Sequence, residues 1–305
     1  MRASRTTSSI ISLIAVCLWV AGCQSLPLST GAGFATAQPE SEALDSGNRE
    51  SNSFAHSSRR TFPAQGWWCG EFEEWLAPER AERGYAIVLP GVEGTSFHNI
   101  SIARGLVDAE FPGAVEVRDW TTGHWPMFVY HLMALERNRR EARAIAEQIV
   151  AYQDRYPGRP VSLVGHSGGA AMAVLVLESL PEDRRITQAV LLAAAIAPDH
   201  DLTTALSRTD RGITNFYSWG DVPHLVAGTL TLGTVDRKHT VSAGAGGFVV
   251  PTDVSAAGRE LYATRLQQVP YRLEMVKSFN AGGHIGSTNR KFVTEWVAPR
   301  LAHSP

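Results

Sequence analysis

The sequence predicts an α/β domain in which a mostly parallel sheet carries helices on both faces. Short apolar runs typical of buried strands alternate with stretches of helical period, and this alternation is the signature of repeated βα units. A hydrophobic share of 44% leaves enough apolar side chain to cover such a sheet, and a charged share of 19% is ordinary for a globular protein. Because one such domain absorbs roughly 200 to 250 residues, the 305 residues indicate one folded domain with an appendage.

The apolar runs place the expected strands between residues 85 and 279 of the chain. We expect strands over residues 85–90, 114–118, 161–165, 189–195, 214–218 and 273–279. A long helix is expected between the second and third strands, since its apolar residues recur on one face, at Ala142, Ile145, Ile149 and Tyr152. A last helix is expected over residues 289–302.

The N-terminus has the pattern of an export signal. Basic residues precede an apolar run over residues 10–20 that is too short for a permanent membrane-spanning helix. The Val-Ala-Gly-Cys sequence that ends at Cys23 resembles a bacterial lipoprotein box, which implies a signal peptide over residues 1–22 and diacylglycerol on the Cys23 sulfur. Gln24 resembles an outer-membrane sorting signal. We expect an exported protein, lipid-anchored in the cell envelope; the alternative is a plain signal peptide with a chance cysteine.

The segment after Cys23 differs in composition from the rest of the chain. Residues 23–65 are rich in Ser, Gly, Ala, Pro and Glu and show neither helical nor strand period, so they cannot bury enough apolar area to become ordered. We expect a disordered tether there and the folded domain over residues 66–305. Phe72 and Trp75 are among the aromatic residues that mark where packing begins. Cys69 is left without a partner, so no intrachain disulfide is expected.

The strand expected at 161–165 leads into a Gly-x-Ser-x-Gly motif centred on Ser167. A nucleophilic serine at a sharp strand-to-helix turn needs small flanking residues, and Gly165 and Gly169 meet that need. The following helix would present its N-terminal amides to an oxyanion, with the N–H of Gly168 as one donor. A helix-capping serine is the structural alternative. A phosphate-binding loop is disfavoured, because no lysine follows the glycines.

With this motif and the order of its elements, the chain resembles the α/β-hydrolase superfamily over roughly residues 80–302. The resemblance implies a serine hydrolase whose second oxyanion donor lies on the loop after the first strand. Members of the superfamily often begin this loop with His-Gly, whereas this chain has Pro90-Gly91. We expect the N–H of Val92 to be the donor, with Glu93 as the next choice.

The superfamily order of nucleophile, acid and base directs the search for the other two groups of a triad. His284 follows the strand expected at 273–279 in a glycine-rich loop, which makes it the predicted base. Asp221 follows the preceding strand and is the predicted acid, with Asp199 as the alternative acid. The other histidines that fit the chain order as base are His200, His224 and His239.

These residues predict a carboxylic-ester hydrolase, esterase- or lipase-like, that works through an acyl-enzyme on Ser167. A small-molecule or lipid ester is the expected substrate, and a monomer is the expected state. The alternatives are a non-catalytic envelope binding or scaffold lipoprotein on a degenerate hydrolase fold, and an acyltransferase.

Other function classes are disfavoured by charge and by missing motifs. The net charge of -2 provides no basic surface for nucleic acid. No His, Asp and Cys set has metal-ligand spacing and no cofactor fingerprint is present, so we expect neither metal nor cofactor. Residues 199–212 are too few for a large lid. In the longer stretch before the last strand, we interpret Asp236 and Arg237 as braces of their own loop; the alternative is that they bind a substrate.

Overall fold

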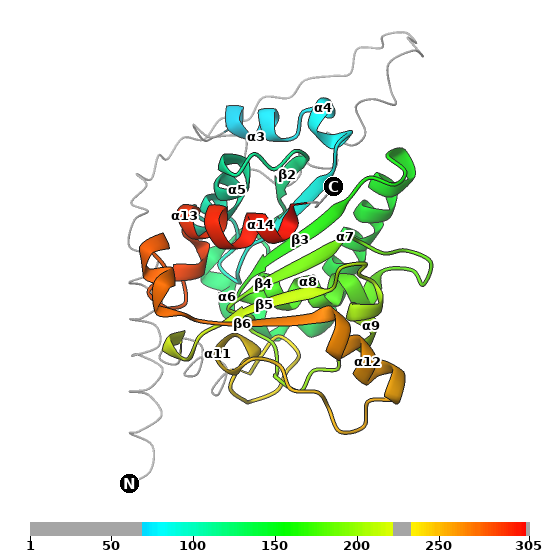
Figure 1. Cartoon of the computed structure of the whole chain (residues 1–305), viewed down its shortest axis with the longest axis vertical. Helices are drawn as coiled ribbons and strands as arrows, with labels where there is room; N and C mark the ends of the chain where they lie inside the picture. Colours follow the sequence, from blue (N-terminus) through cyan, green and yellow to red (C-terminus); the bar gives the residue numbers. More distant parts are fainter. Residues whose placement is uncertain (1–68, 222–232, 303–305) are drawn as a thin grey trace, which may run out of the picture. The chain divides into compact units, whose positions relative to one another are not determined.

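The computed structural model describes residues 69–221 and 233–302. The signal peptide, the tether and Cys23 predicted above lie outside these ranges. A parallel sheet with the strand order β2-β1-β3-β4-β5-β6 forms the centre of the described part (Figure 1). Its strands are β1 (Tyr85–Leu89), β2 (Ala114–Val117), β3 (Val161–His166), β4 (Gln188–Leu192), β5 (Ile213–Tyr217) and β6 (Leu266–Pro270). Because the strands are parallel, their carboxyl ends meet at one edge of the sheet.

Helices cover both faces of this sheet. Figure 1 shows α7 (Leu135–Arg155) and α8 (Gly168–Ser179) on one face, and α5 (Phe97–Asp108), α13 (Arg290–Phe292) and α14 (Ala298–Leu301) on the other. A π-helical turn, Val293–Val297, joins the last two. This arrangement confirms the predicted α/β class, a parallel sheet with helices on both faces. The other α-helices of the described residues are α3 (Cys69–Trp75), α4 (Pro78–Ala81), α6 (Phe128–Met133), α9 (Thr203–Ser207), α11 (Ala243–Gly246) and α12 (Ala256–Arg265).

The alternation of side chains along the strands builds a core on each face. Ala86 and Val88 of β1 pack with the helices α5 and α13 in one apolar cluster, to which Phe72 and Trp75 also belong, as the sequence predicts. Ile87 between them is fully buried and points to the opposite face, because successive strand residues alternate. Both faces of the sheet are therefore covered.

Helices α7 and α8 illustrate two kinds of burial. In α7 the predicted apolar face is buried, at Ala142, Ile145, Ile149 and Tyr152, while the opposite face is in water. In α8 every residue from Gly168 to Leu177 is buried, because this helix contacts β3 and β4 on one side and α7 on another. The start of α8 is thus held from several directions, which matters for the residue that precedes it.

The prediction of a strand over 273–279 is wrong. The last strand is β6, and residues Leu273–Ser278 form a 3₁₀-helix. Since β6 is the edge strand, Gln267 and Gln268 are exposed in it, and the sequence lacks the apolar run that marks a central strand. In the 3₁₀-helix Met275 and Ser278 are buried at a spacing of one turn while Leu273 is 81% exposed.

The connection between β4 and β5 is short. Between β4 and β5 the chain forms α9 and no larger insertion, as the sequence predicts. No helix within residues 69–221 and 233–302 is long and apolar enough to cross a bilayer.

Candidate active site

Ser167 occupies the turn between β3 and α8 with a backbone conformation of φ 54° and ψ -118°. A non-glycine residue rarely adopts this conformation, and it persists only when its surroundings over-determine it. The neighbouring backbone shows how. A Cβ on Gly165 would lie 2.4 Å from the carbonyl oxygen of Gly169, and a Cβ on Gly169 would lie 2.1 Å from that of Leu89. Only glycine fits at these two positions, so the motif reflects a packing requirement at the turn.

The side chain of His284 reaches this serine. Its Nε2 lies 3.1 Å from Ser167 Oγ, which is hydrogen-bonding distance. With Nε2 unprotonated, the imidazole accepts the hydroxyl proton, which is the geometry of a general base and its nucleophile. The loop that carries His284 is shaped by Asn280, whose Oδ1 accepts a hydrogen bond of 2.9 Å from the Gly282 amide. The structure therefore brings the predicted nucleophile and the predicted base together.

His166, the residue inside the motif that precedes the serine, holds the base in place. Its Nε2 lies 3.0 Å from the carbonyl oxygen of His284 and donates to it, since a carbonyl only accepts. The ring is buried, and burial, with the neighbouring His284 as the next cause, lowers the pKa of His166 to about 3. The ring is therefore neutral at physiological pH. Sequence reasoning did not find this role, because the motif leaves this position unspecified.

The predicted acid, Asp221, ends the short 3₁₀-helix Trp219–Asp221 after β5. This helix packs against the loop of the base, because a Cβ on Gly220 would lie 2.8 Å from the carbonyl oxygen of Gly282. The backbone thus places Asp221 beside the His284 loop. The Asp221 side chain lies outside the described part of the structure, so its role stays a prediction.

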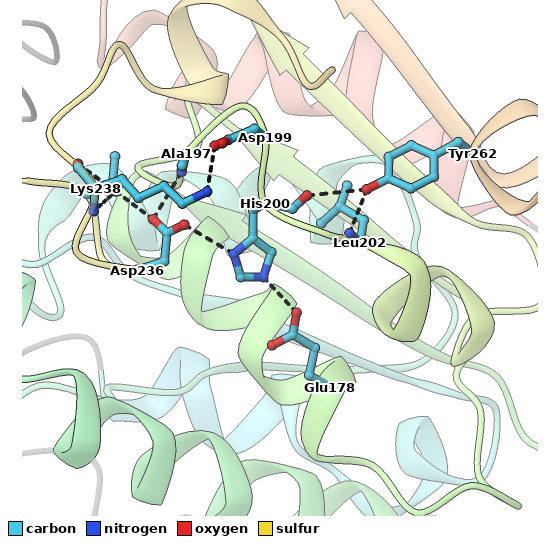
Figure 2. Close-up of polar contacts among 9 residues, drawn as sticks. Glu178, Ala197, Asp199, His200, Leu202, Asp236, Lys238 and Tyr262 are labelled. Atoms are coloured by element: carbon cyan, nitrogen blue, oxygen red, sulfur yellow. Dashed lines mark hydrogen bonds and ion pairs between the residues drawn. The ribbon is translucent and has the colours of Figure 1, made fainter. Parts of the chain in front are cut away.

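The alternative acid, Asp199, has a different environment. It forms an ion pair of 2.8 Å with Lys238, and both side chains are about half exposed (Figure 2). Its neighbour His200, one of the other candidate bases, lies between Asp236 and Glu178, with ring-nitrogen to oxygen distances of 3.1 and 2.7 Å. These contacts favour a structural role for Asp199 and His200. Of the remaining candidate bases, His224 lies outside the described residues.

The loop predicted to supply the second oxyanion donor is held by its carbonyl groups. Pro90 O accepts from Trp120 Nε1 at 2.7 Å, Val92 O from His131 Nδ1 at 2.8 Å, and Gly94 O from Asn99 Nδ2 at 3.2 Å. None of these donors was singled out from the sequence, because each lies far along the chain or on another element.

The two predicted oxyanion donors are neighbours. A Cβ on Gly168 would lie 3.3 Å from the amide nitrogen of Val92. Within the described ranges neither of these amides donates a hydrogen bond to another residue. Gly168 begins helix α8, so its N–H has no intrahelical partner, and the positive end of the helix dipole lies there. These two amides are available to donate to a negatively charged oxygen next to Ser167, which is the role that the sequence predicts for them.

Metal chemistry has no comparable set of residues. In the part of the chain that the structure describes, no group of three or more His, Cys, Asp or Glu side chains is arranged to hold an ion.

No family model and no curated protein matches the sequence. Among solved structures, the chain is similar to a dienelactone hydrolase-like promiscuous phosphotriesterase from metagenomic libraries, with 15% identity and a TM-score of 0.38 over 62% of this chain and 70% of that chain. It is similar to Est1E from Butyrivibrio proteoclasticus, with 13% identity and a TM-score of 0.41 over 74% and 90%. Aspergillus fumigatus lipase B follows, with 12% identity and a TM-score of 0.47 over 92% and 64%. Similarities this low carry no conclusion about activity.

Proposed function

We propose that this chain is a serine hydrolase that cleaves carboxylic esters through an acyl-enzyme on Ser167. The observation that carries the proposal is the hydrogen bond of 3.1 Å between Ser167 Oγ and His284 Nε2, made at a strained turn in front of two unpaired amides. A helix-capping serine needs none of these features. In fact, the Ser167 side chain makes no capping hydrogen bond to α8.

The reaction follows from the positions of these groups. Ser167 Oγ attacks the acyl carbonyl carbon, and His284 Nε2 takes the hydroxyl proton. The carbonyl oxygen becomes an oxyanion and accepts hydrogen bonds from the Gly168 and Val92 amides. The carbon–oxygen bond to the alcohol then breaks, and His284 returns the proton to the leaving alkoxide. Water attacks the acyl-enzyme by the same route and releases the acid and the free serine.

In this proposal Asp221 accepts a hydrogen bond from Nδ1 of His284. A carboxylate there holds the tautomer with Nε2 unprotonated and stabilises the imidazolium that forms when the serine loses its proton. The contact between Gly220 and Gly282 supports the proposal, because it joins the two segments that carry these side chains.

A fluorophosphonate probe tests the proposal, since it reacts with a serine only when a base activates the hydroxyl. We expect the full-length protein to be labelled, the label to be lost in Ser167→Ala, and p-nitrophenyl esters to be hydrolysed. A folded protein that is neither labelled nor active on esters of any chain length would favour the scaffold alternative. Transfer of the acyl group to an added alcohol in preference to water would identify an acyltransferase.

We also propose that the protein is exported and anchored through a lipid on Cys23, at the outer membrane in a Gram-negative cell. The support is the sequence around Cys23 after an apolar segment. Metabolic labelling with an alkyne fatty acid should mark the wild-type protein and not Cys23→Ser. Equal labelling of both would contradict the anchor.

A further inference from the structure

Helix α6 contains a buried histidine, His131, which contacts the loop after β1 that carries Val92. His131 is fully buried, although its neighbours Tyr130 and Met133 on the same helix are 45% and 40% exposed. Its ring meets that of Trp120 at a centroid distance of 6.2 Å and an interplanar angle of 67°. Trp120 in turn donates to Pro90 O, so both rings contact the segment that carries Val92.

The hydrogen bonds of His131 determine which of its nitrogens carries the proton. Nε2 lies 3.0 Å from the backbone nitrogen of Thr122, and a backbone N–H only donates, so Nε2 accepts. Nδ1 lies 2.8 Å from Val92 O, and a carbonyl only accepts, so Nδ1 donates. Only the neutral tautomer with its proton on Nδ1 makes both hydrogen bonds. Burial lowers the pKa of His131, which is consistent with a neutral ring.

The backbone of His131 is fixed as well. Asn138 on α7 donates from Nδ2 to the His131 carbonyl oxygen at 2.7 Å, and Asn138 is fully buried. His131 is thus held at two points, at its backbone by α7 through Asn138 and at its ring by Thr122 through Nε2. A donor held in this way restricts the orientation of the residue whose carbonyl it binds, here Val92.

We propose that His131 is a positioning residue for the reaction: its Nδ1–H holds the Val92 carbonyl and so limits rotation of the Val92 backbone, which keeps the Val92 N–H beside Gly168 for the oxyanion. The proposal rests on the proposed function. His131 itself touches neither the nucleophile nor the substrate in this role. It acts only through the loop, so its loss should weaken binding of the oxyanion more than binding of the uncharged substrate.

Two substitutions separate the two hydrogen bonds of the ring. In His131→Asn the amide nitrogen takes the place of Nδ1 and can donate to Val92 O, while the Thr122 amide loses its acceptor. In His131→Gln the amide oxygen takes the place of Nε2 and can accept from Thr122, while Val92 O loses its donor. We expect His131→Gln to lower kcat about ten- to a hundredfold with KM within about twofold, and His131→Asn to stay within a few-fold of wild type.

A second readout reports the oxyanion site without turnover. An aryl boronate adds to Ser167 Oγ, and the resulting tetrahedral adduct places a boron-bound oxygen where the oxyanion forms. Its affinity should fall in His131→Gln by about the same factor as kcat/KM and should change little in His131→Asn. Losses that are equal in both variants and follow their melting temperatures would overturn the proposal, since they would show a role in stability alone.

The wild-type protein provides the test that does not depend on the folding of a variant. Nitrogen-15 NMR of labelled histidine should show His131 as the neutral Nδ1–H tautomer, and an Nε2–H or charged ring would overturn the assignment. Wild-type protein without esterase activity or fluorophosphonate labelling would overturn the proposed function and this role with it. Active wild-type protein with two equally active variants would overturn the role of His131 alone.

Discussion

A histidine lies at each end of helix α8, buried at the start and partly buried at the last turn, and the two rings differ in charge. At its start, after Ser167, His166 is neutral, because burial and the nearby His284 lower its pKa to about 3. In its last turn Glu178 contacts His200. There burial alone would lower the pKa, but the hydrogen bonds to Asp236 and Glu178 outweigh burial and raise it to about 9.

The difference follows from the residues around each ring and from the helix itself. The helix dipole places partial positive charge at the start of α8, which opposes an imidazolium and favours an oxyanion, and partial negative charge at its end, which favours an imidazolium. The twelve residues of α8 separate the two ends by about 18 Å. Chemistry at one end and a charged structural contact at the other are therefore compatible in one helix.

The contacts at the far end join three segments of the chain. His200 follows β4, Glu178 belongs to α8, and Asp236 lies in the segment before α11, where its carboxylate also accepts from the Ala197 amide at 3.1 Å (Figure 2). The interpretation of Asp236 as a brace of its loop agrees with these contacts. We refer to Glu178, His200 and Asp236 as the His200 clamp.

Removal of the proposed nucleophile should give the largest effect, and a substitution at the other end of α8 should not reproduce it. We expect Ser167→Ala to lower kcat by about a thousandfold to a millionfold, with little change in melting temperature. Ser179→Ala at the last position of the same helix is the matched control, since Ser179 Oγ only donates to Leu175 O at 2.7 Å. Ester hydrolysis by both variants is compared. Comparable activity of the two would contradict the assignment of the nucleophile.

Substitution of the predicted acid, compared with substitution of the alternative acid, should give the next largest effect. Asp221→Asn should lower kcat by up to about ten-thousandfold, because an asparagine favours the wrong tautomer of the base. Asp199→Asn breaks an exposed ion pair with Lys238 and should leave kcat within a few-fold. Steady-state kinetics of both variants decide between them. The reverse order of effects would make Asp199 the acid.

Loss of the His200 clamp should affect stability and leave the chemistry largely intact. His200→Gln leaves two carboxylates without their shared cation. Breaking a buried ion pair costs about 3 to 5 kcal/mol of unfolding free energy, which is the upper bound for this partly buried cluster. Asp199→Asn, which breaks an exposed pair nearby, should cost at most about 1 kcal/mol. Urea denaturation measures both. A fall in kcat as large as that of Asp221→Asn, with unchanged stability, would show that the two ends of α8 are not independent.

The same clamp predicts a pH dependence of stability, the smallest of these effects. The pKa of His200 is raised from 6.5 to about 9 in the folded protein, so its contribution is complete below pH 6.5 and is lost as the pH rises through 9. The pKa of Asp236 is lowered from 3.8, mainly by the hydrogen bond from His200 against the opposing effect of burial. Its contribution is therefore complete above pH 3.8 and lost below.

We therefore expect the unfolding free energy of wild type to fall by up to about 3 kcal/mol between pH 6.5 and pH 10. In His200→Gln most of this alkaline decrease should disappear. Urea denaturation at several pH values tests this, and an equal decrease in both proteins would show that another group causes it.

The sequence alone predicted the class of fold, the nucleophile and its partner in the chain order. Val161 to His166 is a fully buried strand, and a serine between glycines after such a strand is a local signal. The buried face of α7 was also predictable from a local signal, because its apolar residues recur with a period of 3.6 residues within one segment. His284 was reached by chain order, although the strand expected just before it is a 3₁₀-helix and the true strand β6 is polar at the sheet edge.

The tertiary structure decided what lies around those residues. That Gly169 leaves no room for a Cβ depends on the approach of Leu89 from another strand. The charge of each histidine ring depends on its neighbours: His166 meets a carbonyl group and a second imidazole, whereas His200 meets two carboxylates. His131 reaches Val92 across 39 positions of the chain. Contacts between segments so far apart are set by how elements pack, and no local pattern of residue types encodes them.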